Sequence, residues 1–277
     1  MPSQSANALQ NLTGTLALAG AGKMGGAMLT GWLAGGLEAS RVIVIEPQPS
    51  PEIAALTARG IRLNPAASDI GTVETLVVAV KPQSFRGAGI ALKSFTGPAT
   101  LVVSIMAGAT IASIAEVCGG AVVRAMPNTP AAIGRGITVA VAAQNVSAAQ
   151  RTVADALLRA TGAVEWVDDE TLMDAVTAVS GSGPAYVFLL AEELARAGVE
   201  AGLPAELATR LARETVAGSG ELLRRSEASS ATLRQNVTSP GGTTAAALDV
   251  LMGTGGMRPL MVRAIAAATK RSKDLAK

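Results

Sequence analysis

Short apolar runs alternate with amphipathic segments along the first half of the chain. The apolar runs are rich in Val, Ile and Leu and predict buried β-strands at 15–20, 41–46, 75–80, 100–105, 121–126, 136–142 and 163–168. Helical spacing lies between them, at 23–35, 51–58, 82–93, 110–118 and 147–160. Continuous apolar strands separated by helices are typical of a mostly parallel sheet covered on both faces. The pattern leaves open whether the later strands run antiparallel.

After residue 170 the strand pattern ends and only helical periodicity remains. Leu207, Leu211 and Val216 keep roughly helical spacing within alanine-rich segments. We therefore expect an α/β fold in which a doubly wound sheet is followed by an all-helical domain. The expected division is a mobile tail at 1–12, the sheet domain at 13–169 and the helical domain at 170–277.

Composition removes several kinds of chemistry. The 277 residues are 49% hydrophobic with a formal net charge of +2, which gives no general case for nucleic-acid or membrane binding. The chain has no histidine and a single cysteine, Cys118, so a Ser-His-Asp triad and the common zinc sites are excluded and no metal is expected. No apolar run is long enough to cross a bilayer and the first 22 residues lack Lys and Arg, so a cytoplasmic protein is expected.

A glycine-rich stretch follows the first predicted strand. Gly20, Gly22 and Gly25 form G-x-G-x-x-G, and Glu46 ends the next predicted strand. In this context Gly20 allows the turn, Gly22 lets a pyrophosphate approach the backbone, and Gly25 lets helix and strand pack closely. A plain strand-to-helix turn would also use glycine. The sequence context favours a Rossmann-like dinucleotide-binding domain, with phosphates held at the helix N-terminus.

Other predicted strands also end in turns that contain glycine, proline or polar residues. Ligands of open parallel sheets bind beyond the carboxyl ends of the strands, although turn formers occur in any such loop. These turns therefore predict the wall of a cofactor cleft. The residues expected there are Gly20, Ala21, Gly22, Lys23, Met24, Gly25, Glu46, Lys81, Pro82, Met106, Ala107, Gly108 and Asn128.

Glu46 bears on which dinucleotide binds. A carboxylate at this position accepts hydrogen bonds from the ribose 2′-hydroxyl of NADH and repels the 2′-phosphate of NADPH. Pro47, Gln48 and Pro49 add no basic side chain. We therefore expect NADH or NADPH as the cofactor, with a preference for NADH.

Three further stretches carry a resemblance to a known family: RAMPNTPA (124–131), VSGSGPAYVF (179–188) and LRQNVTSPGGTTAAALDVL (233–251). With the glycine motif and AVKP (79–82), they resemble pyrroline-5-carboxylate reductase from about Thr15 onward. The resemblance implies hydride transfer from NADH or NADPH to the C=N carbon of 1-pyrroline-5-carboxylate, the last step of proline biosynthesis. This reaction suits a chain without histidine, because an imine nitrogen is basic enough to arrive protonated.

The stretch SPGGTT (239–244) is the predicted substrate site. It offers backbone N–H groups at the start of a predicted helix, which suits the substrate carboxylate, although a loop with a threonine N-cap would leave the same pattern. By resemblance, the Thr244 hydroxyl holds and can protonate the ring nitrogen. The predicted substrate-binding residues are Glu227, Ser239, Gly241, Gly242, Thr243 and Thr244, of which Thr244 is also catalytic.

The resemblance implies further roles. Asn236 meets the nicotinamide end of the cofactor, and Ala79, Val80 and Lys81 lie near the cofactor. Asn128 is expected to position the carboxamide, although a turn asparagine before Pro130 would leave the same pattern. On sequence alone, Glu227 is better explained as a solvated acid beside Arg224 and Arg225. Met106 replaces a small residue of the family and is expected to narrow the cleft. The stretch SGSGP (180–184) is expected to break or kink a helix, with Ser182 a lesser candidate for ligand contact.

In this family the helical domains of two subunits intertwine, and the active site forms between the nucleotide domain of one subunit and the helical domain of the other. We therefore expect a homodimer that can assemble further. An alternative is a related nicotinamide-dependent dehydrogenase that reduces a different imine or a keto acid. The absence of Lys from 171–269 counts against the β-hydroxyacid dehydrogenases. A cofactor-sensing module without catalysis is disfavoured, because it would not need the substrate carboxylate site predicted in SPGGTT. A purely structural helical oligomer is disfavoured, because it would leave the first half of the chain unexplained.

Overall fold

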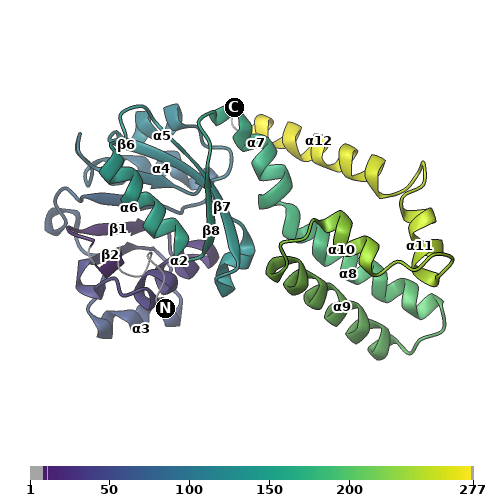
Figure 1. Cartoon of the computed structure of the whole chain (residues 1–277). Coiled ribbons are helices and arrows are strands. Elements are labelled where there is room, and N and C mark those ends of the chain that lie inside the picture. The colour runs from purple at the N-terminus through teal and green to yellow at the C-terminus, as the bar shows by residue number, and fades with distance from the viewer. Residues whose placement is uncertain (1–8, 11, 276–277) are drawn as a thin grey trace. The chain divides into compact units, whose positions relative to one another are not determined.

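The computed structural model describes residues 9–10 and 12–275. The chain forms two compact units (Figure 1). The first runs to Gly181 and includes the residues from Thr269 onward, and the second is Ser182–Ala268.

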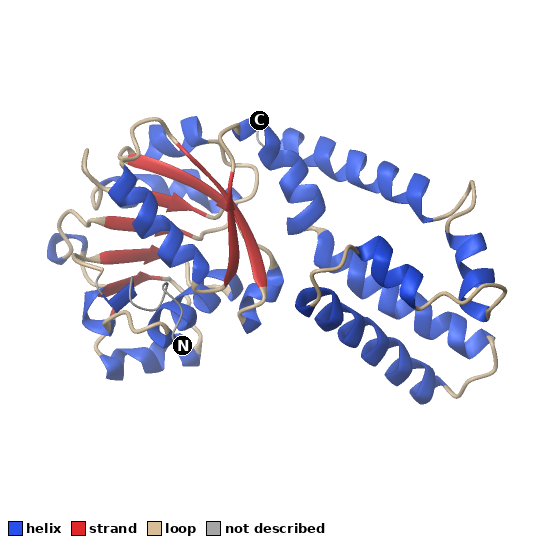
Figure 2. Ribbon diagram, in the orientation of Figure 1, coloured by secondary structure: helices blue, strands red, loops and turns tan. Residues whose placement is uncertain are grey.

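In the described part of the first unit, the strands, red in Figure 2, form an eight-stranded sheet with the order β3-β2-β1-β4-β5-β6-β7-β8. The strands from β3 to β6 in this order are parallel, which confirms the doubly wound sheet. β7 runs antiparallel to β6, and β8 is parallel to β7. The strands are β1 (Leu16–Ala19), β2 (Val42–Ile45), β3 (Arg62–Leu63), β4 (Thr75–Val78), β5 (Leu101–Ser104), β6 (Ala121–Met126), β7 (Gly136–Ala142) and β8 (Gly162–Trp166).

Helices and short turns connect these strands. The helices are α2 (Lys23–Ala34), α3 (Pro51–Ala55), α4 (Pro82–Lys93), α5 (Ile111–Cys118), α6 (Ala148–Arg159) and α7 (Met173–Val176). The 3₁₀ turns are η1 (Ala39–Arg41), η2 (Leu56–Arg59), η3 (Ala67–Asp69), η4 (Thr129–Ile133) and η5 (Glu170–Leu172), and η6 (Thr177–Gly181) is a π-helical turn. Capping boxes, in which Ser or Thr and the residue three positions later bond each other's backbone, start α5 and α6.

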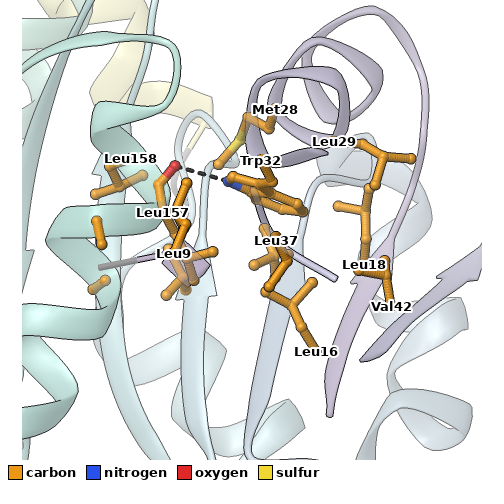
Figure 3. Packing of buried hydrophobic residues seen from close by; sticks show 14 of the residues in the cluster. Leu9, Leu16, Leu18, Met28, Leu29, Trp32, Leu37, Val42, Leu157 and Leu158 are labelled. Carbon is orange, nitrogen blue, oxygen red and sulfur yellow. Dashed lines mark hydrogen bonds between the residues drawn. The ribbon is translucent and has the colours of Figure 1, made fainter. Parts of the chain in front are cut away.

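The sheet has a separate apolar core on each face, because alternate side chains of a strand point in opposite directions. Leu16 and Leu18 of β1 lie in the core that includes α2 and α6. Ala17 and Ala19 lie in the core that includes α4 and α5. Trp32 of α2 is fully buried, and its Nε1 donates to the Leu157 carbonyl oxygen of α6 at 2.8 Å (Figure 3).

Leu9 and Leu12 also pack in the first of these cores. They were expected in the mobile tail, but they are only 2% and 7% exposed and therefore belong to the fold. Residues 1–8 and 11 of that expected tail lie outside the described residues.

The second unit is helical. Its helices are α8 (Gly183–Glu200), α9 (Ala205–Arg225), α10 (Ser230–Asn236), α11 (Thr243–Leu251) and α12 (Met257–Leu275), the last of which ends in the first unit. α8 and α9 pack closely through small residues, since a Cβ added at Gly198 would lie 3.2 Å from that of Ala208. None of the described helices is long and apolar enough to span a membrane.

The compact units divide the chain later than the expected boundary at residue 169. Met173 of α7 and Ala178 of η6 are fully buried and belong to the first unit. The Ser272 hydroxyl also donates to Oδ1 of Asp174 at 2.7 Å, which ties the end of α12 to α7. The first stretch of the first unit therefore ends at the π-helical turn η6. This turn overlaps SGSGP (180–184), where a helix break or kink was expected.

Candidate active site

The three glycines after β1 have different structural requirements. Gly20 has φ +91°, and a Cβ there would lie 2.7 Å from the carbonyl carbon of Ala79. A Cβ at Gly25 would collide with the Gly20 carbonyl oxygen, so both positions need glycine for the fold itself. Gly22 is exposed, and a Cβ there would meet no atom within 4 Å. Packing therefore does not require glycine at position 22, where the residue is the N-cap of α2 and leaves the backbone open to solvent.

Glu46 follows β2 and its side chain lies against this loop. Oε2 of Glu46 accepts the Ala21 N–H at 2.9 Å, and Oε1 accepts the Gln48 N–H at 3.1 Å. The residue is half-buried. A negative charge is therefore held beside the start of α2, where the sequence predicts the dinucleotide.

Asn64, which the sequence analysis did not single out, holds the backbone of Glu46. Oδ1 of Asn64 accepts the Glu46 N–H at 2.8 Å, and Nδ2 donates to the Glu46 carbonyl oxygen at 2.8 Å. Asn64 also has a positive φ of 47°. A signal was present in the sequence, because asparagine tolerates this conformation better than most residues and here stands before a proline at a strand end.

The remaining predicted cofactor residues of the first unit follow neighbouring parallel strands, so the sheet brings their loops to one edge. Ala79 and Val80 continue β4, and Lys81 is the exposed residue that starts α4. Gly108 has φ +76° in the loop after β5. Asn128 follows β6, and its Oδ1 accepts the Ile137 N–H at 2.9 Å.

Met106 differs from its expectation. It was expected to narrow the cleft, but its side chain is 3% exposed and packs in the core with Phe85 and Ile114. A long unbranched side chain fills this interior space readily. Because the exposure of the whole residue is 3% and its N–H donates to Oγ of Ser104 at 3.3 Å, Met106 is not left to face a cofactor.

An ion pair joins three parts of the first unit near the same edge. The Arg124 guanidinium of β6 is 2.9 Å from Oε1 of Glu170, and the same oxygen accepts the Ile111 N–H at 2.8 Å. The Arg124 side chain is 6% exposed, so its charge depends on this partner. The sequence analysis missed the pair, because nothing local signals a contact between residues so far apart in the chain.

The predicted substrate residues Ser239, Gly241 and Gly242 form a tight turn. The Gly242 N–H donates to the Ser239 carbonyl oxygen at 3.0 Å, with Pro240 and Gly241 between them and Gly241 at φ +70°. Proline followed by a residue with positive φ is typical of a type II turn. The Gly242 N–H is thus used inside the turn and, contrary to the expectation of successive free N–H groups, does not point to a ligand.

Helix α11 begins directly after this turn with Thr243 and Thr244. Its N-cap is Gly242, and no side chain caps it, so the alternative of a threonine N-cap does not hold. Thr243 is exposed and Thr244 is half-buried. The backbone N–H groups of the first turn and two hydroxyls are therefore gathered at one helix N-terminus, which favours an anion.

Glu227 and Asn236 also lie in the second unit, and both are exposed. The exposure of Glu227 agrees with the solvated acid expected on sequence alone, while Arg224 and Arg225 pair with Glu221, whose carboxylate is 2.7 Å from nitrogens of both. Hydrogen bonds from these arginines lower the pKa of Glu221 to about 2. Glu227 is therefore not the partner of the two arginines.

Comparisons with known proteins agree with this geometry. A family model described as "Pyrroline-5-carboxylate reductase dimerisation" matches residues 170–275. A second, described as "NADP oxidoreductase coenzyme F420-dependent", matches residues 15–108. A curated pyrroline-5-carboxylate reductase of Pseudomonas aeruginosa is 40% identical over 268 residues, which cover 95% of this chain and 97% of that protein.

Solved structures are similar over the same extent. A pyrroline-5-carboxylate reductase from Coxiella burnetii has a TM-score of 0.87 and 33% identity, covering 96% of this chain and 100% of that one. The Plasmodium falciparum pyrroline carboxylate reductase, solved with NADP bound, has a TM-score of 0.78 and 29% identity, covering 96% and 99%. The similarity thus extends over both the sheet and the helical unit.

Proposed function

The chain belongs to the pyrroline-5-carboxylate reductase family and reduces 1-pyrroline-5-carboxylate to L-proline; we propose that it takes the hydride from NADH rather than NADPH. The observation that supports this choice of cofactor is the position of the Glu46 carboxylate, which accepts the Ala21 N–H of the glycine-rich loop. A carboxylate oxygen has lone pairs for more than one donor, so Glu46 can also accept a ribose hydroxyl. The 2′-phosphate of NADPH would meet its negative charge.

We propose that the first unit binds the dinucleotide through the loop after β1 and the edge formed by the β4, β5 and β6 loops. The residues proposed to hold it are Gly20, Ala21, Gly22, Lys23, Met24, Gly25, Glu46, Ala79, Val80, Lys81, Pro82, Ala107, Gly108 and Asn128. Asn236 of the second unit is proposed for the nicotinamide end. The bound cofactor supplies the hydride for the C=N carbon.

The start of α11 is proposed to bind the substrate. Its first-turn N–H groups and the Thr243 hydroxyl suit the carboxylate, and the Thr244 hydroxyl faces the ring nitrogen. The turn Ser239–Gly242 sets where this helix begins. Reduction adds a hydride to carbon while the nitrogen carries a proton, so Thr244 serves chiefly to hold that nitrogen in place. Glu227 is proposed to lie near the substrate as well.

We also propose a homodimer formed through the second unit. Among the described residues of this unit, the buried apolar side chains are Ala208 and Ala212. Large apolar side chains remain exposed, for example Phe188 at 67% and Val250 at 75%. A helical unit with so little buried apolar area is not stable alone, so a second copy is the natural cover for these faces.

The direct test is oxidation of NADH in the presence of 1-pyrroline-5-carboxylate, with product identified as L-proline. We expect turnover with this substrate and none with 2-keto acids. Turnover confined to a different imine or to a keto acid would refute the proposed substrate. Sedimentation at low concentration tests the dimer, and an active monomer would refute it.

A further inference from the structure

We propose that Asn64 is a positioning residue for cofactor selection, which acts by fixing Glu46; this inference rests on the proposed role of Glu46. Asn64 lies directly after β3, the neighbour of β2 in the sheet. Its side-chain amide makes two hydrogen bonds of 2.8 Å to the backbone of Glu46, one to the N–H and one to the carbonyl oxygen. Asn64 thus contacts Glu46 from the β3 side of β2, whereas Ala21 of the glycine-rich loop follows β1 on the other side.

The strand pairing explains why a side chain does this. β2 and β3 pair in parallel through Ile43 with Arg62 and Val44 with Leu63, and the Asn64 N–H donates to the Val44 carbonyl oxygen at 2.8 Å. A continued ladder would next join the Glu46 N–H to the backbone carbonyl of Asn64. At Asn64, however, the backbone turns away with φ 47°.

The amide of Asn64 replaces the missing peptide group. Like a peptide group, it offers one acceptor and a donor in one plane, and it meets both polar atoms of the Glu46 backbone. The sheet is thus extended by one residue, and that residue is Glu46. Without the amide, Glu46 would be the first unpaired residue after β2 and free to change its backbone angles.

This restraint matters because selection depends on where the carboxylate stands. A glutamate side chain that swings away neither bonds a ribose hydroxyl nor repels a phosphate. Here the backbone of Glu46 is held from one side by Asn64, and its carboxylate from the other by Ala21 at 2.9 Å and by Gln48 at 3.1 Å. A charge fixed before binding discriminates more strongly than a mobile one, because no ordering cost falls on the correct cofactor.

The test is the Asn64→Gly variant, since glycine accepts a positive φ without strain and only the amide is lost. We expect the KM for NADH to rise roughly 2- to 10-fold, as for the loss of one or two net hydrogen bonds. The kcat at saturating NADH and the KM for the imine should stay unchanged, and the preference for NADH over NADPH should fall. The matched control is Asn145→Gly, which removes a similar bond from Nδ2 to the Gly120 carbonyl oxygen at 3.2 Å and should leave the preference unchanged.

Glu46→Ala and the double variant Glu46→Ala/Asn64→Gly are assayed in parallel. They distinguish a failure of the role inferred for Asn64 from a failure of the role proposed for Glu46. If Asn64 acts through Glu46, Asn64→Gly lowers the NADH preference of the wild type but not that of Glu46→Ala. Additive effects, or an equal loss with both cofactors, would overturn the inference while leaving the role of Glu46 intact. If Glu46→Ala itself does not change the preference, the proposed cofactor selection fails and the inference with it. Should Asn64→Gly not fold, Asn64→His, which tolerates a positive φ but does not offer the planar amide, is assayed against the same outcomes.

Discussion

The N–H of Ala21 donates to Oε2 of Glu46 at 2.9 Å, so the loop after β1 and the acidic end of β2 are joined. The two strands are parallel neighbours, with Leu18 paired to Val44, and their loops therefore emerge together. In the proposed complex the loop receives the diphosphate and Glu46 receives the ribose. The two parts of the cofactor site are thus one structural unit.

Gly22→Ala should separate binding from folding. A Cβ at this position meets no atom within 4 Å, so the variant should unfold at nearly the wild-type temperature. Its methyl group occupies space proposed for the diphosphate, and we expect the Kd for NADH to rise about tenfold or more, by fluorescence titration. Gly87→Ala on α4 also places a free Cβ and should bind NADH normally. Unchanged NADH affinity in Gly22→Ala would show that the cofactor does not approach this loop.

Glu170→Ala should destabilise the first unit. It leaves the Arg124 guanidinium, 6% exposed, without its carboxylate, and it removes the acceptor of the Ile111 N–H. We expect a loss of about 2–4 kcal/mol in the free energy of unfolding, measured in urea. Glu221→Ala, which breaks an ion pair on an exposed helix, is the control and should cost far less. Equal losses from the two variants would contradict a structural role for the Arg124 pair.

The Thr244→Ala variant should slow reduction of the imine without weakening the binding of NADH. Loss of a hydrogen bond to the ring nitrogen in the transition state should lower kcat/KM for the imine roughly 10- to 100-fold. Thr244→Ser keeps the hydroxyl and should retain most of the activity. Thr209→Ala on α9, which loses only a bond to the Ala205 carbonyl oxygen, should behave as wild type. A wild-type rate in Thr244→Ala would remove this residue from the mechanism.

Cys118 should make stability depend on alkaline pH. Burial raises the pKa of its thiol from the ordinary 9.0 to about 11. The unfolded chain then loses this proton near pH 9 while the folded chain keeps it, so the stabilisation is complete below pH 9 and declines as the pH rises toward 11. Urea unfolding across this range should show a decline that is smaller in Cys118→Ala. Parallel pH profiles of the two proteins would rule out the effect.

Local patterns were sufficient to predict much of the first unit. The apolar runs of β1, β2, β4, β5 and β6 are continuous because these strands are covered on both faces, and each appears where it was expected. β3 was missed, since two residues, Arg62 and Leu63, make no periodic pattern. The predicted helix at 51–58 ends at Ala55 and continues as a 3₁₀ turn to Gly60, which has φ 100°.

Features of the candidate site that depend on local spacing could be predicted from the sequence, and those that depend on distant contacts could not. The need for glycine at Gly20 and Gly25 follows from the strand-to-helix turn, and the structure confirms it. The hydrogen bonds from Asn64 to Glu46 depend on the pairing of β2 with β3. The ion pair of Glu170 with Arg124 depends on the contact of η5 with β6. Met106 was misplaced because sequence does not say on which side of a loop a side chain packs.

We propose that Glu46 selects NADH for the reduction of 1-pyrroline-5-carboxylate by this enzyme. A comparison of kcat/KM for NADH and NADPH, with this imine as the acceptor, tests that selection. We expect a higher value for NADH and a reduced or reversed difference in Glu46→Ala, while Glu165→Gln on β8 leaves the ratio unchanged. A wild-type enzyme that uses NADPH more efficiently than NADH would contradict it.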